Sequence, residues 1–488
     1  MPFSWREYHE ATKHSVESLS RARNVLDWAN MPDAFRHYEG AALIDLPADP
    51  PAPGMSFQDV LGGLQAAPSL GGPSFLSSLL YYSAAISASK RVPSAGYTYA
   101  LRVNPSSGNL HPTEFHFITN GLAGWDDGLY HYRPSSHMAE QRARGGFRVP
   151  CVEGCSLVFV LTSIAWREAW KYGSRAYRYC LHDIGHAWQA LALAARALGC
   201  ETFARGGFPD DELAALCRLN GDEWPMLLIG IKGAPRSAGP RDASGQTWCG
   251  GEPNELSRET IIYSLIEQIH TATKADIRGT VASARTGTGT IQLPAPAVST
   301  RAFGEMVRAR RSALDFVGRS QSMTLAQLAA ILEAATGTLA ADFGGARFIQ
   351  LYLYAHRVDG LEPGVYRFWP EGGALELVRG GDQRVAAAGL SLGQDLAGNA
   401  CIAFSMIGDL ERATRAHGDR GYRYAHFEAG AIGHRLYLIA EALGLAATGI
   451  GAFYDDEVNQ YLHLKSHDGQ VAYHFAIGYP VPDIRLSA

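Results

Sequence analysis

The sequence lacks paired cysteines, long apolar runs and any marked excess of one charge. Its seven Cys are scattered without a CxxC pair, which is typical of free thiols in a reducing compartment. Lys and Arg together number 43 and Asp and Glu 48, a near balance that argues against a dedicated nucleic-acid binder. No apolar run reaches the roughly 18 residues of a membrane span, and the first residues form no apolar signal core. We therefore expect a cytoplasmic protein that binds neither nucleic acid nor membrane.

Apolar residues are abundant, at 47% of the chain, whereas charged residues make up 19%. This composition supplies ordinary hydrophobic cores and excludes a disordered chain. At about 100–200 residues per domain, a length of 488 residues predicts two to four domains. The 53 Gly predict many tight turns or close backbone approaches.

The clearest internal signal is a repeat. Residues 172–212 align with residues 417–457 without a gap, at an offset of 245 positions, and 17 of the 41 aligned residues are identical. The shared segments include a Tyr-Arg-Tyr triplet at 177–179 and 422–424 and an Asp-Asp-Glu triplet at 210–212 and 455–457. A period this long is not that of a solenoid. It indicates two copies of one domain of about 200 residues.

The duplication sets the predicted domain limits. Copy one is expected over residues 71–273 and copy two over 301–488, joined by a Thr-, Gly-, Ala- and Pro-rich linker at 274–300. Residues 1–70 are predicted to be an N-terminal extension without a counterpart in the second half.

Each copy mixes helical and strand patterns. Apolar spacing predicts helices at 73–90, 177–199, 324–336 and 422–444, and one at 253–273 with Asn254 as a possible cap. Strands are predicted at 113–118, 156–164, 226–233, 347–355, 400–408 and 472–480. Short strands interleaved with long helices predict an α+β fold in three layers, with a sheet flanked by helices in each copy.

Two segments have the chemistry of a phosphate or cofactor site. Arg310, Arg311 and Ser312 place two guanidinium groups and a hydroxyl on one turn, which suits a phosphate, although a solvated basic helix start has the same composition. Residues 104–112 form a turn-rich loop whose hydroxyls, amide and backbone N–H groups can hold a polar cofactor tail, or which is simply a loop. Its candidate binding residues are Pro105, Ser106, Ser107 and Asn109.

Gly-rich loops follow both long helices, at 204–208 and 448–453. Gly449, Ile450 and Gly451 would allow the backbone to approach a flat ligand. Neither loop is a dinucleotide fingerprint, because each follows a helix rather than a strand.

Lys171 and Tyr172 are a candidate acid–base pair just before the repeated segment, with an exposed Lys as the plainer interpretation. His182 and His186 have the spacing of a zinc-binding helix, but the Glu base and a third ligand are missing. We therefore predict histidines packed in a helix and no metal site.

Taken together, these segments resemble the nitroreductase superfamily of FMN flavoproteins. The combination of PSSGNLHPTEFHFI, WKYGSRAYRY, LHDIGH and FPDDEL is similar to the SagB/ThcOx-type dehydrogenases, which oxidise peptide thiazolines and oxazolines. The resemblance implies FMN, held by an Arg-Ser motif of one subunit and a PSS-type loop of the other, with a Gly loop at the flavin edge. It also implies proton abstraction by the pair that Lys171 and Tyr172 match, with hydride transfer to flavin N5.

The two copies depart from the family pattern in complementary ways. Copy one keeps the PSSGN loop and the Lys-Tyr pair, while copy two keeps the Arg-Arg-Ser motif and the Gly loop. The copy-two counterpart of PSSGN is reduced to residues 342–346, and that of Lys-Tyr to Ala416 and His417. We therefore expect an intramolecular pseudo-dimer with one complete FMN site. Arg485 is the candidate for further neutralising the phosphate, and Arg175 for lowering the pKa of Lys171.

Several functions remain open at this stage. A generic FMN reductase would act on nitro compounds, quinones or activated alkenes with NAD(P)H. The chain could also oxidise another small metabolite, or bind flavin as a non-catalytic partner protein. The expected partners are a small-molecule or modified-peptide substrate and biosynthetic enzymes.

Overall fold

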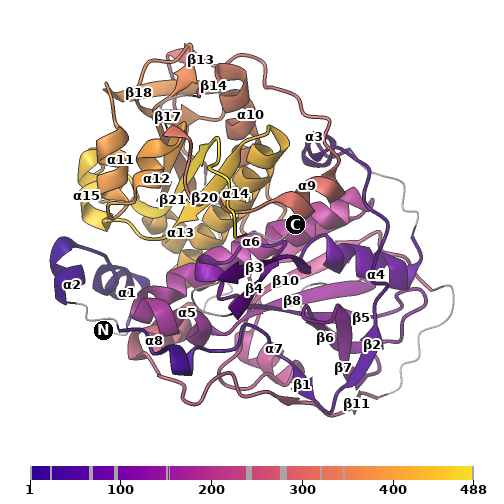
Figure 1. Cartoon of the computed structure of the whole chain (residues 1–488). Helices are drawn as coiled ribbons and strands as arrows, with labels where there is room; N and C mark the ends of the chain where they lie inside the picture. The colour runs from indigo at the N-terminus through magenta and orange to yellow at the C-terminus, as the bar shows by residue number, and fades with distance from the viewer. Residues whose placement is uncertain are drawn as a thin grey trace.

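The computed structural model of the chain describes residues 3–21, 25–64, 70–92, 97–149, 152, 154–237, 245–274, 283–318, 321–344 and 347–485. It contains two large antiparallel sheets, each flanked by helices. Figure 1 shows copy one in indigo to magenta below copy two in orange to yellow. The predicted α+β fold with two tandem domains is confirmed.

The first sheet belongs to copy one and has the order β11-β7-β6-β5-β8-β10-β9, with β2 also paired to β7. All its pairings are antiparallel. The strands are β2 (Ala42–Asp45), β5 (Thr113–Thr119), β6 (Gly128–Arg133), β7 (Met138–Arg144), β8 (Leu157–Ser163), β9 (Glu201–Arg205), β10 (Trp224–Lys232) and β11 (Thr247–Trp248).

The second sheet repeats this topology in copy two, with the order β13-β18-β17-β15-β19-β21-β20. In this order the six strands β18-β17-β15-β19-β21-β20 occupy the positions of β7-β6-β5-β8-β10-β9 in the first sheet. The duplication seen in the sequence therefore extends to the sheet. The strands are β13 (Ile291–Gln292), β15 (Ile349–Ala355), β17 (Gly364–Trp369), β18 (Ala374–Gly380), β19 (Ile402–Gly408), β20 (Ala446–Ile450) and β21 (Gln470–Gly478).

Three two-stranded pairings lie outside these sheets. They are β1 (Tyr38–Glu39) with β12 (Glu252–Pro253), β3 (Ile86–Val92) with β4 (Tyr97–Arg102), and β14 (Met323–Thr324) with β16 (Val358–Asp359).

The helices differ greatly in length and burial. The two longest, α6 (Ala176–Ala197) and α14 (Gly421–Ala442), are almost entirely buried. The others are α1 (Trp5–Ala11), α2 (Val16–Arg21), α3 (Phe57–Leu61), α4 (Gly72–Tyr81), α5 (Ala165–Tyr172), α7 (Asp210–Leu216), α8 (Ser264–Lys274), α9 (Phe303–Ala309), α10 (Leu325–Thr336), α11 (Arg384–Leu390), α12 (Asp395–Asn399), α13 (Leu410–His417) and α15 (Asp455–Tyr461). Within the described residues, no helix is long and apolar enough to cross a membrane.

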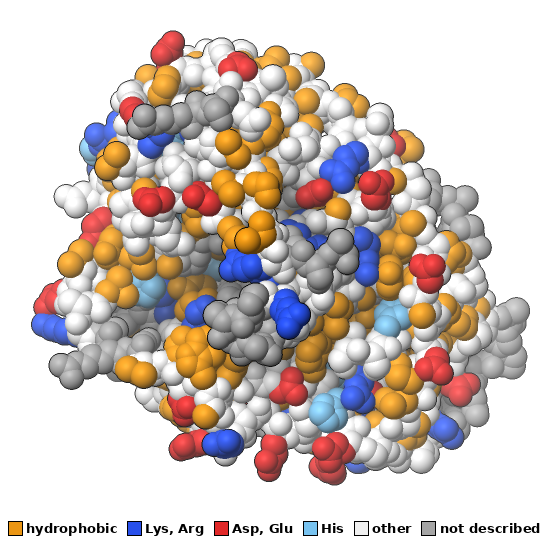
Figure 2. All heavy atoms as spheres, viewed as in Figure 1, with side chains coloured by type: hydrophobic (Ala, Val, Ile, Leu, Met, Phe, Trp, Pro, Cys, Tyr) orange, Lys and Arg blue, Asp and Glu red, His pale blue; other side chains and the backbone are white. Residues whose placement is uncertain are grey.

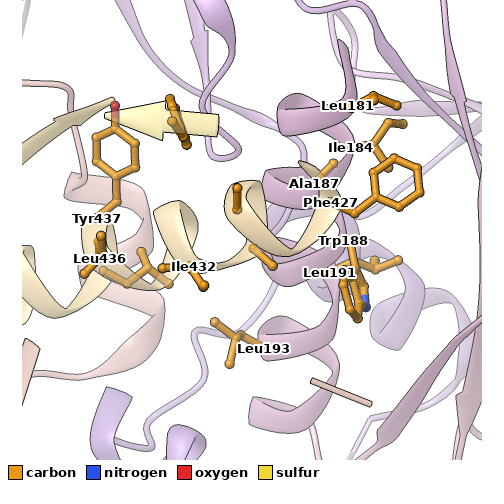
Figure 3. Packing of buried hydrophobic residues seen from close by; sticks show 14 of the residues in the cluster. Leu181, Ile184, Ala187, Trp188, Leu191, Leu193, Phe427, Ile432, Leu436 and Tyr437 are labelled. Carbon is orange, nitrogen blue, oxygen red and sulfur yellow. The ribbon is translucent and has the colours of Figure 1, made fainter. Parts of the chain in front are cut away.

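Helices α6 and α14 pack against each other at the centre of the molecule (Figure 3). They cross at Gly185 and Gly430, which are equivalent positions of the repeat. A Cβ on Gly185 would overlap the carbonyl of Phe427, and a Cβ on Gly430 that of His182. The crossing therefore requires Gly in both copies, because any side chain would push the backbones apart.

Reciprocal ion pairs join the two copies on either side of this crossing. Arg175 and Arg178 of copy one bind Asp455 of copy two at 2.8 and 2.7 Å. The equivalent Arg420 and Arg423 of copy two bind Asp210 of copy one, at 2.5 and 2.7 Å. All of these side chains are buried. The repeated Arg, Tyr and Asp residues of the sequence are thus the interface between the copies.

The N-terminal helix α1 and helix α8 hold equivalent places at this interface, although we expected the N-terminal segment to have no counterpart. Both carry the pattern His-x-Ala-Thr-Lys, at 9–13 and 270–274. Lys13 pairs with Asp456 at 2.8 Å, and Lys274 with Asp211 at 2.7 Å. The carbonyls of the two histidines accept hydrogen bonds from the guanidinium groups of the interface.

Nine expected segments match closely and two do not. The long helices, α10 and the six strands lie within about two residues of their predicted limits. The helix predicted at 73–90 ends at Tyr81, because residues 86–92 pair with β4 instead. The helix predicted at 253–273 begins only at Ser264, and Asn254 accepts the backbone N–H of His37 rather than capping a helix. Residues 275–282 of the expected linker lie outside the described residues.

Candidate functional site

A cavity of about 600 Å³ lies between the two copies. Copy one contributes the β3–β4 hairpin, the loop after β4, and side chains of α5 and α6, while copy two contributes the turn after α9 and the end of β20. Every binding residue expected from the sequence lines it: Pro105, Ser106, Ser107, Asn109, Arg310, Arg311, Ser312, Gly449, Ile450, Gly451 and Arg485. Figure 2 shows Lys and Arg side chains gathered in the middle of the molecular face above β3 and β4.

Arg310 lies at the C-terminal end of α9, with only 4% of its surface exposed. Its guanidinium donates to the carbonyls of Arg102 and Val103 at 3.3 Å and stacks over the Tyr437 ring. Its Nη1 has no hydrogen-bond partner among the described residues. Burial lowers the pKa of Arg310. A buried cation with a free donor facing a cavity is suited to an anionic group of a ligand.

Arg311 adds a second guanidinium at the same end of the cavity. It donates to Ser87 and to the carbonyls of Arg308 and Arg310. Burial, followed by repulsion from Arg310 and Arg308, lowers the pKa of Arg311 to about 10. An anion bound here would relieve that repulsion.

Arg485 reaches the cavity from the chain end, as expected, but its charge is already paired. Its Nε donates to Asp483 at 2.8 Å, and Lys90 of β3 binds the same carboxylate at 2.7 Å. The side chain is 38% exposed. Arg485 is therefore a weaker anion ligand than Arg310.

The loop at 104–109 is fixed by a carboxylate that the sequence analysis did not single out. Asp183 of α6 accepts the backbone N–H of Ser107 at 3.1 Å and its hydroxyl at 3.1 Å. Ser106 in turn accepts the backbone N–H of His111. Burial raises the pKa of Asp183 to about 7, although these hydrogen bonds oppose the shift.

The Gly loop of copy two forms the opposite wall. A Cβ on Gly449 would overlap the hydroxyl of Tyr473, and one on Gly451 the ring of Tyr179. Both glycines are therefore required for the wall to lie this close to its aromatic neighbours. The backbone N–H of Gly449 donates to the hydroxyl of Tyr437 at 2.9 Å.

Lys171 and Tyr172 end helix α5 above Gly108 of the loop. A Cβ on Gly108 would lie 2.6 Å from Tyr172 Oη and 3.2 Å from Lys171 Nζ, so the absent side chain leaves space for both polar tips. Tyr172 lines the cavity, and its ring lies 4.7 Å from that of Tyr179. Burial, reinforced by Glu168 and Tyr179, raises the pKa of Tyr172 well above its usual value. We expected Arg175 to lower the pKa of Lys171, but its guanidinium group is paired with Asp455 at the interface between the copies.

The pseudo-symmetric position is filled. Phe343, in the copy-two counterpart of the PSSGN loop, is 4% exposed and stacks on Tyr424 with ring centroids 4.3 Å apart. Asp342 accepts the backbone N–H groups of Gly206 and Gly207 at 2.8 and 3.0 Å. In this half, the loop that carries Asp342 and Phe343 is therefore hydrogen-bonded directly to the Gly206–Gly207 segment. The last two residues of the expected counterpart, 345 and 346, lie outside the described residues.

The two helical histidines are packed in the interior rather than arranged around an ion. His182 stacks on Tyr473 at 4.3 Å, and His186 hydrogen-bonds the hydroxyl of that Tyr at 3.2 Å. Among the described residues, no group of three or more His, Cys, Asp or Glu side chains could hold a metal ion.

Comparison with known proteins identifies the fold. The model of the nitroreductase family matches residues 84–233 and 307–479, one segment in each copy. The chain belongs to the nitroreductase family. It is an oxidoreductase of that family with two tandem domains.

Two relatives show the extent of the similarity. A protein of Methanocaldococcus jannaschii named "putative nitroreductase" is 33% identical over 187 residues, which are 36% of this chain and 92% of the relative. A crystal structure of a protein with the same description, from Anabaena variabilis, is 26% identical and superposes with a TM-score of 0.77. That match covers 98% of this chain and 99% of the other, so the tandem arrangement is shared over the full length.

In this nitroreductase-family chain, four residues that also line the cavity were not predicted from the sequence. These are Asp183, Tyr179, Tyr437 and Tyr473. In the sequence, Tyr179 is marked only by the repeated Tyr-Arg-Tyr triplet. Asp183 lies between His182 and His186, which have the spacing of metal ligands. Their roles depend on which helix face meets the loop, and a single sequence does not specify that.

Proposed function

We propose that the cavity binds one FMN per chain. The observation that supports this most strongly is the convergence of Arg310, the loop at 104–109 and the Gly449–Gly451 wall on one space of about 600 Å³, a volume in the range of cofactor pockets. Arg310 and Arg311 would hold the phosphate, because Arg310 has a buried free donor and Arg311 lacks a carboxylate partner among the described residues.

The remaining residues suit a flat ring system and its polar tail. The hydroxyls and amide of the loop at 104–109 would hold the ribityl chain, and the Gly wall leaves no side chain between the backbone and the ring. Bound FMN would supply the two-electron redox chemistry, while the protein orients the substrate and moves the proton.

Lys171 and Tyr172 would act on the substrate as the acid–base pair. Since the pKa of Tyr172 is raised well above its usual value, its hydroxyl keeps its proton near neutral pH and donates a hydrogen bond. The proton-accepting role then falls to Lys171, whose Nζ lies above the same Gly108.

The substrate that this pair favours is a thiazoline or oxazoline ring, as in the SagB-type dehydrogenases that the sequence resembles. Removing the acidic ring proton at Lys171 while a hydride leaves the neighbouring carbon would yield the aromatic azole. The test is mass spectrometry of an azoline-containing peptide incubated with the FMN-loaded protein and oxygen. Loss of two hydrogens supports the proposal, and an unchanged peptide across a panel of azolines contradicts it.

The second candidate is NAD(P)H-dependent reduction of nitro compounds, quinones or activated alkenes. It is favoured by the names of both relatives described above, which call them nitroreductases. Rapid bleaching of the bound flavin by NAD(P)H under nitrogen would support this candidate over the dehydrogenase.

The number of flavins tests the pseudo-dimer separately from the substrate. The filled position at Phe343 predicts one FMN per chain after saturation and gel filtration. Two FMN per chain, measured by absorbance against protein concentration, would contradict a closed second position. Phe343→Ala should not add a flavin, because the opening would still lack an arginine clamp.

A further inference from the structure

Glu168 is a fully buried carboxyl group without a partner. It lies on α5, and its relative exposure is 0%. Neither of its carboxylate oxygens has a hydrogen-bond partner among the described residues. A buried polar group that is left unsatisfied costs stability, so such a group in a packed core calls for a functional explanation.

The position of Glu168 on α5 connects it to the acid–base pair. It precedes Lys171 by three residues and Tyr172 by four, spacings that place side chains next to each other on one helix face. The four rotatable bonds of the Lys171 side chain allow Nζ to move relative to the carboxyl group.

Burial and the neighbouring Asp183 raise the pKa of Glu168 well above its usual value, and Lys171 opposes the shift. Asp183 approaches from α6, and Cys180 and Tyr172 also interact electrostatically with Glu168. Burial therefore favours the protonated form of Glu168, which can give up a proton.

Copy two provides an internal comparison. At the offset of the repeat, Glu168 corresponds to Ala413, Lys171 to Ala416 and Tyr172 to His417. All three groups are therefore absent together from the half whose cavity is filled. By contrast, the Arg and Asp residues of the interface are kept in both halves. This pattern associates Glu168 with the chemistry of the cavity rather than with the packing of the fold.

We propose that Glu168 is the proton reservoir of the Lys171–Tyr172 pair, a role that rests on the function proposed above. When Lys171 has given a proton to a bound substrate, the O–H bond of Glu168 breaks and an N–H bond forms on Lys171, with no change in electron count. In the oxidative direction the path runs backward: when the carboxyl group is ionised, an N–H bond of Lys171 breaks and an O–H bond forms on Glu168. Glu168 touches neither substrate nor cofactor and is a positioning residue.

The kinetic test uses Glu168→Gln, which keeps the shape of the side chain but has no acidic proton. The FMN-loaded protein is reduced with dithionite and mixed with menadione across a pH series. In the wild type, quinone reduction should slow as pH rises through the raised pKa of Glu168. In E168Q the rate of quinone reduction at neutral pH should be lower by about tenfold, and this pH dependence should vanish. An unchanged rate and profile would overturn the proposal.

A second measurement does not depend on activity. Burial holds the pKa of Glu168 in the folded protein well above its unfolded value, so the wild type loses stability as pH rises above the unfolded pKa towards the folded one. E168Q should therefore melt at a higher temperature than the wild type, by a margin that grows with pH. A variant that melts lower at every pH would indicate a structural role and overturn the proposal.

Glu428→Gln is the matched control. Glu428, like Glu168, is a buried acid, but it lies on α14 of copy two. Its carboxylate accepts the backbone N–H groups of Phe348 and Ile349, and burial raises its pKa. E428Q should lower the melting temperature and leave the pH profile of quinone reduction unchanged. A wild type without bound FMN would refute the proposed function, whereas an active wild type matched by E168Q would refute only the reservoir.

Discussion

The open cavity at the loop of copy one and the filled position at the loop of copy two are built from equivalent elements. In the second loop Phe343 packs onto Tyr424, whereas the equivalent Tyr179 borders open space beside the first loop. Asp342 ties the second loop to the Gly wall, whereas Asp183 holds the first loop away from its wall. A few substitutions in one loop thus decide whether the same framework forms a cavity or a core.

The interface between the copies has diverged far less than the two loops. Arg–Asp pairs, Gly crossings and the His-x-Ala-Thr-Lys helices occur in both halves. Fusion into one chain explains the difference, because both halves must still fit each other while only one site needs to work.

The largest expected difference between the halves is catalytic. Lys171→Ala should lower turnover by about two to four orders of magnitude, since it removes the proton-transfer group, and should leave FMN bound. Steady-state kinetics and flavin absorbance of the purified variant measure the two effects. His417→Ala, in the filled half, is the control and should leave turnover unchanged. Retained activity in K171A would remove Lys171 from the mechanism.

The interface should respond equally in both halves. Asp455→Asn and Asp210→Asn each leave two buried arginines without their carboxylate, at a cost of about 3–5 kcal/mol in unfolding free energy. Urea unfolding of the two variants measures this. Burial opposes ionisation of Asp455, but Arg175 and Arg178 lower its pKa. Its stabilising contribution is therefore present above its unfolded pKa and is lost as pH falls through the lower folded pKa. Strongly unequal losses would show that the halves do not share one interface design.

A smaller effect is expected at the phosphate end. Arg310→Ala removes one charge-assisted interaction, and FMN affinity should fall by about 1.5–3 kcal/mol in binding free energy. Fluorescence titration of the apoprotein with FMN gives the value. Arg301→Ala, which removes a half-exposed arginine bound to Glu441, serves as the control and should bind FMN like the wild type. Equal affinity of R310A and wild type would show that the anion site lies elsewhere.

The smallest effect is expected at the cavity rim. Arg485→Ala should reduce FMN affinity by no more than about 1 kcal/mol, because Arg485 is exposed and its charge is shared with Asp483. The same titration at low and high salt measures it, and the difference between wild type and variant should shrink at high salt. A loss as large as that of R310A would make Arg485 a principal phosphate ligand.

Much of the fold was predictable from the sequence because the signals were local or repeated. The apolar periods of α6 and α14 and the runs of β5, β8, β15 and β19 lie close to their expected limits. The helix expected at 73–90 was wrong beyond Tyr81, since the competing pairing of β3 with β4 is not encoded in helical spacing. Asn254 likewise had the composition of a cap but is engaged by His37, a residue far away in the chain.

The sequence by itself determined the duplication, the two-domain α+β fold and part of the cavity lining, because each was carried by a motif or by an exact offset between copies. Only the tertiary structure decided what surrounds those residues. It brought Asp183 to the loop, turned Arg175 to the interface, paired Arg485 with Asp483, and left Glu168 buried without a partner. The reason is physical: charge pairing and burial depend on which groups meet across distant segments, and a linear pattern records composition and spacing but not those encounters.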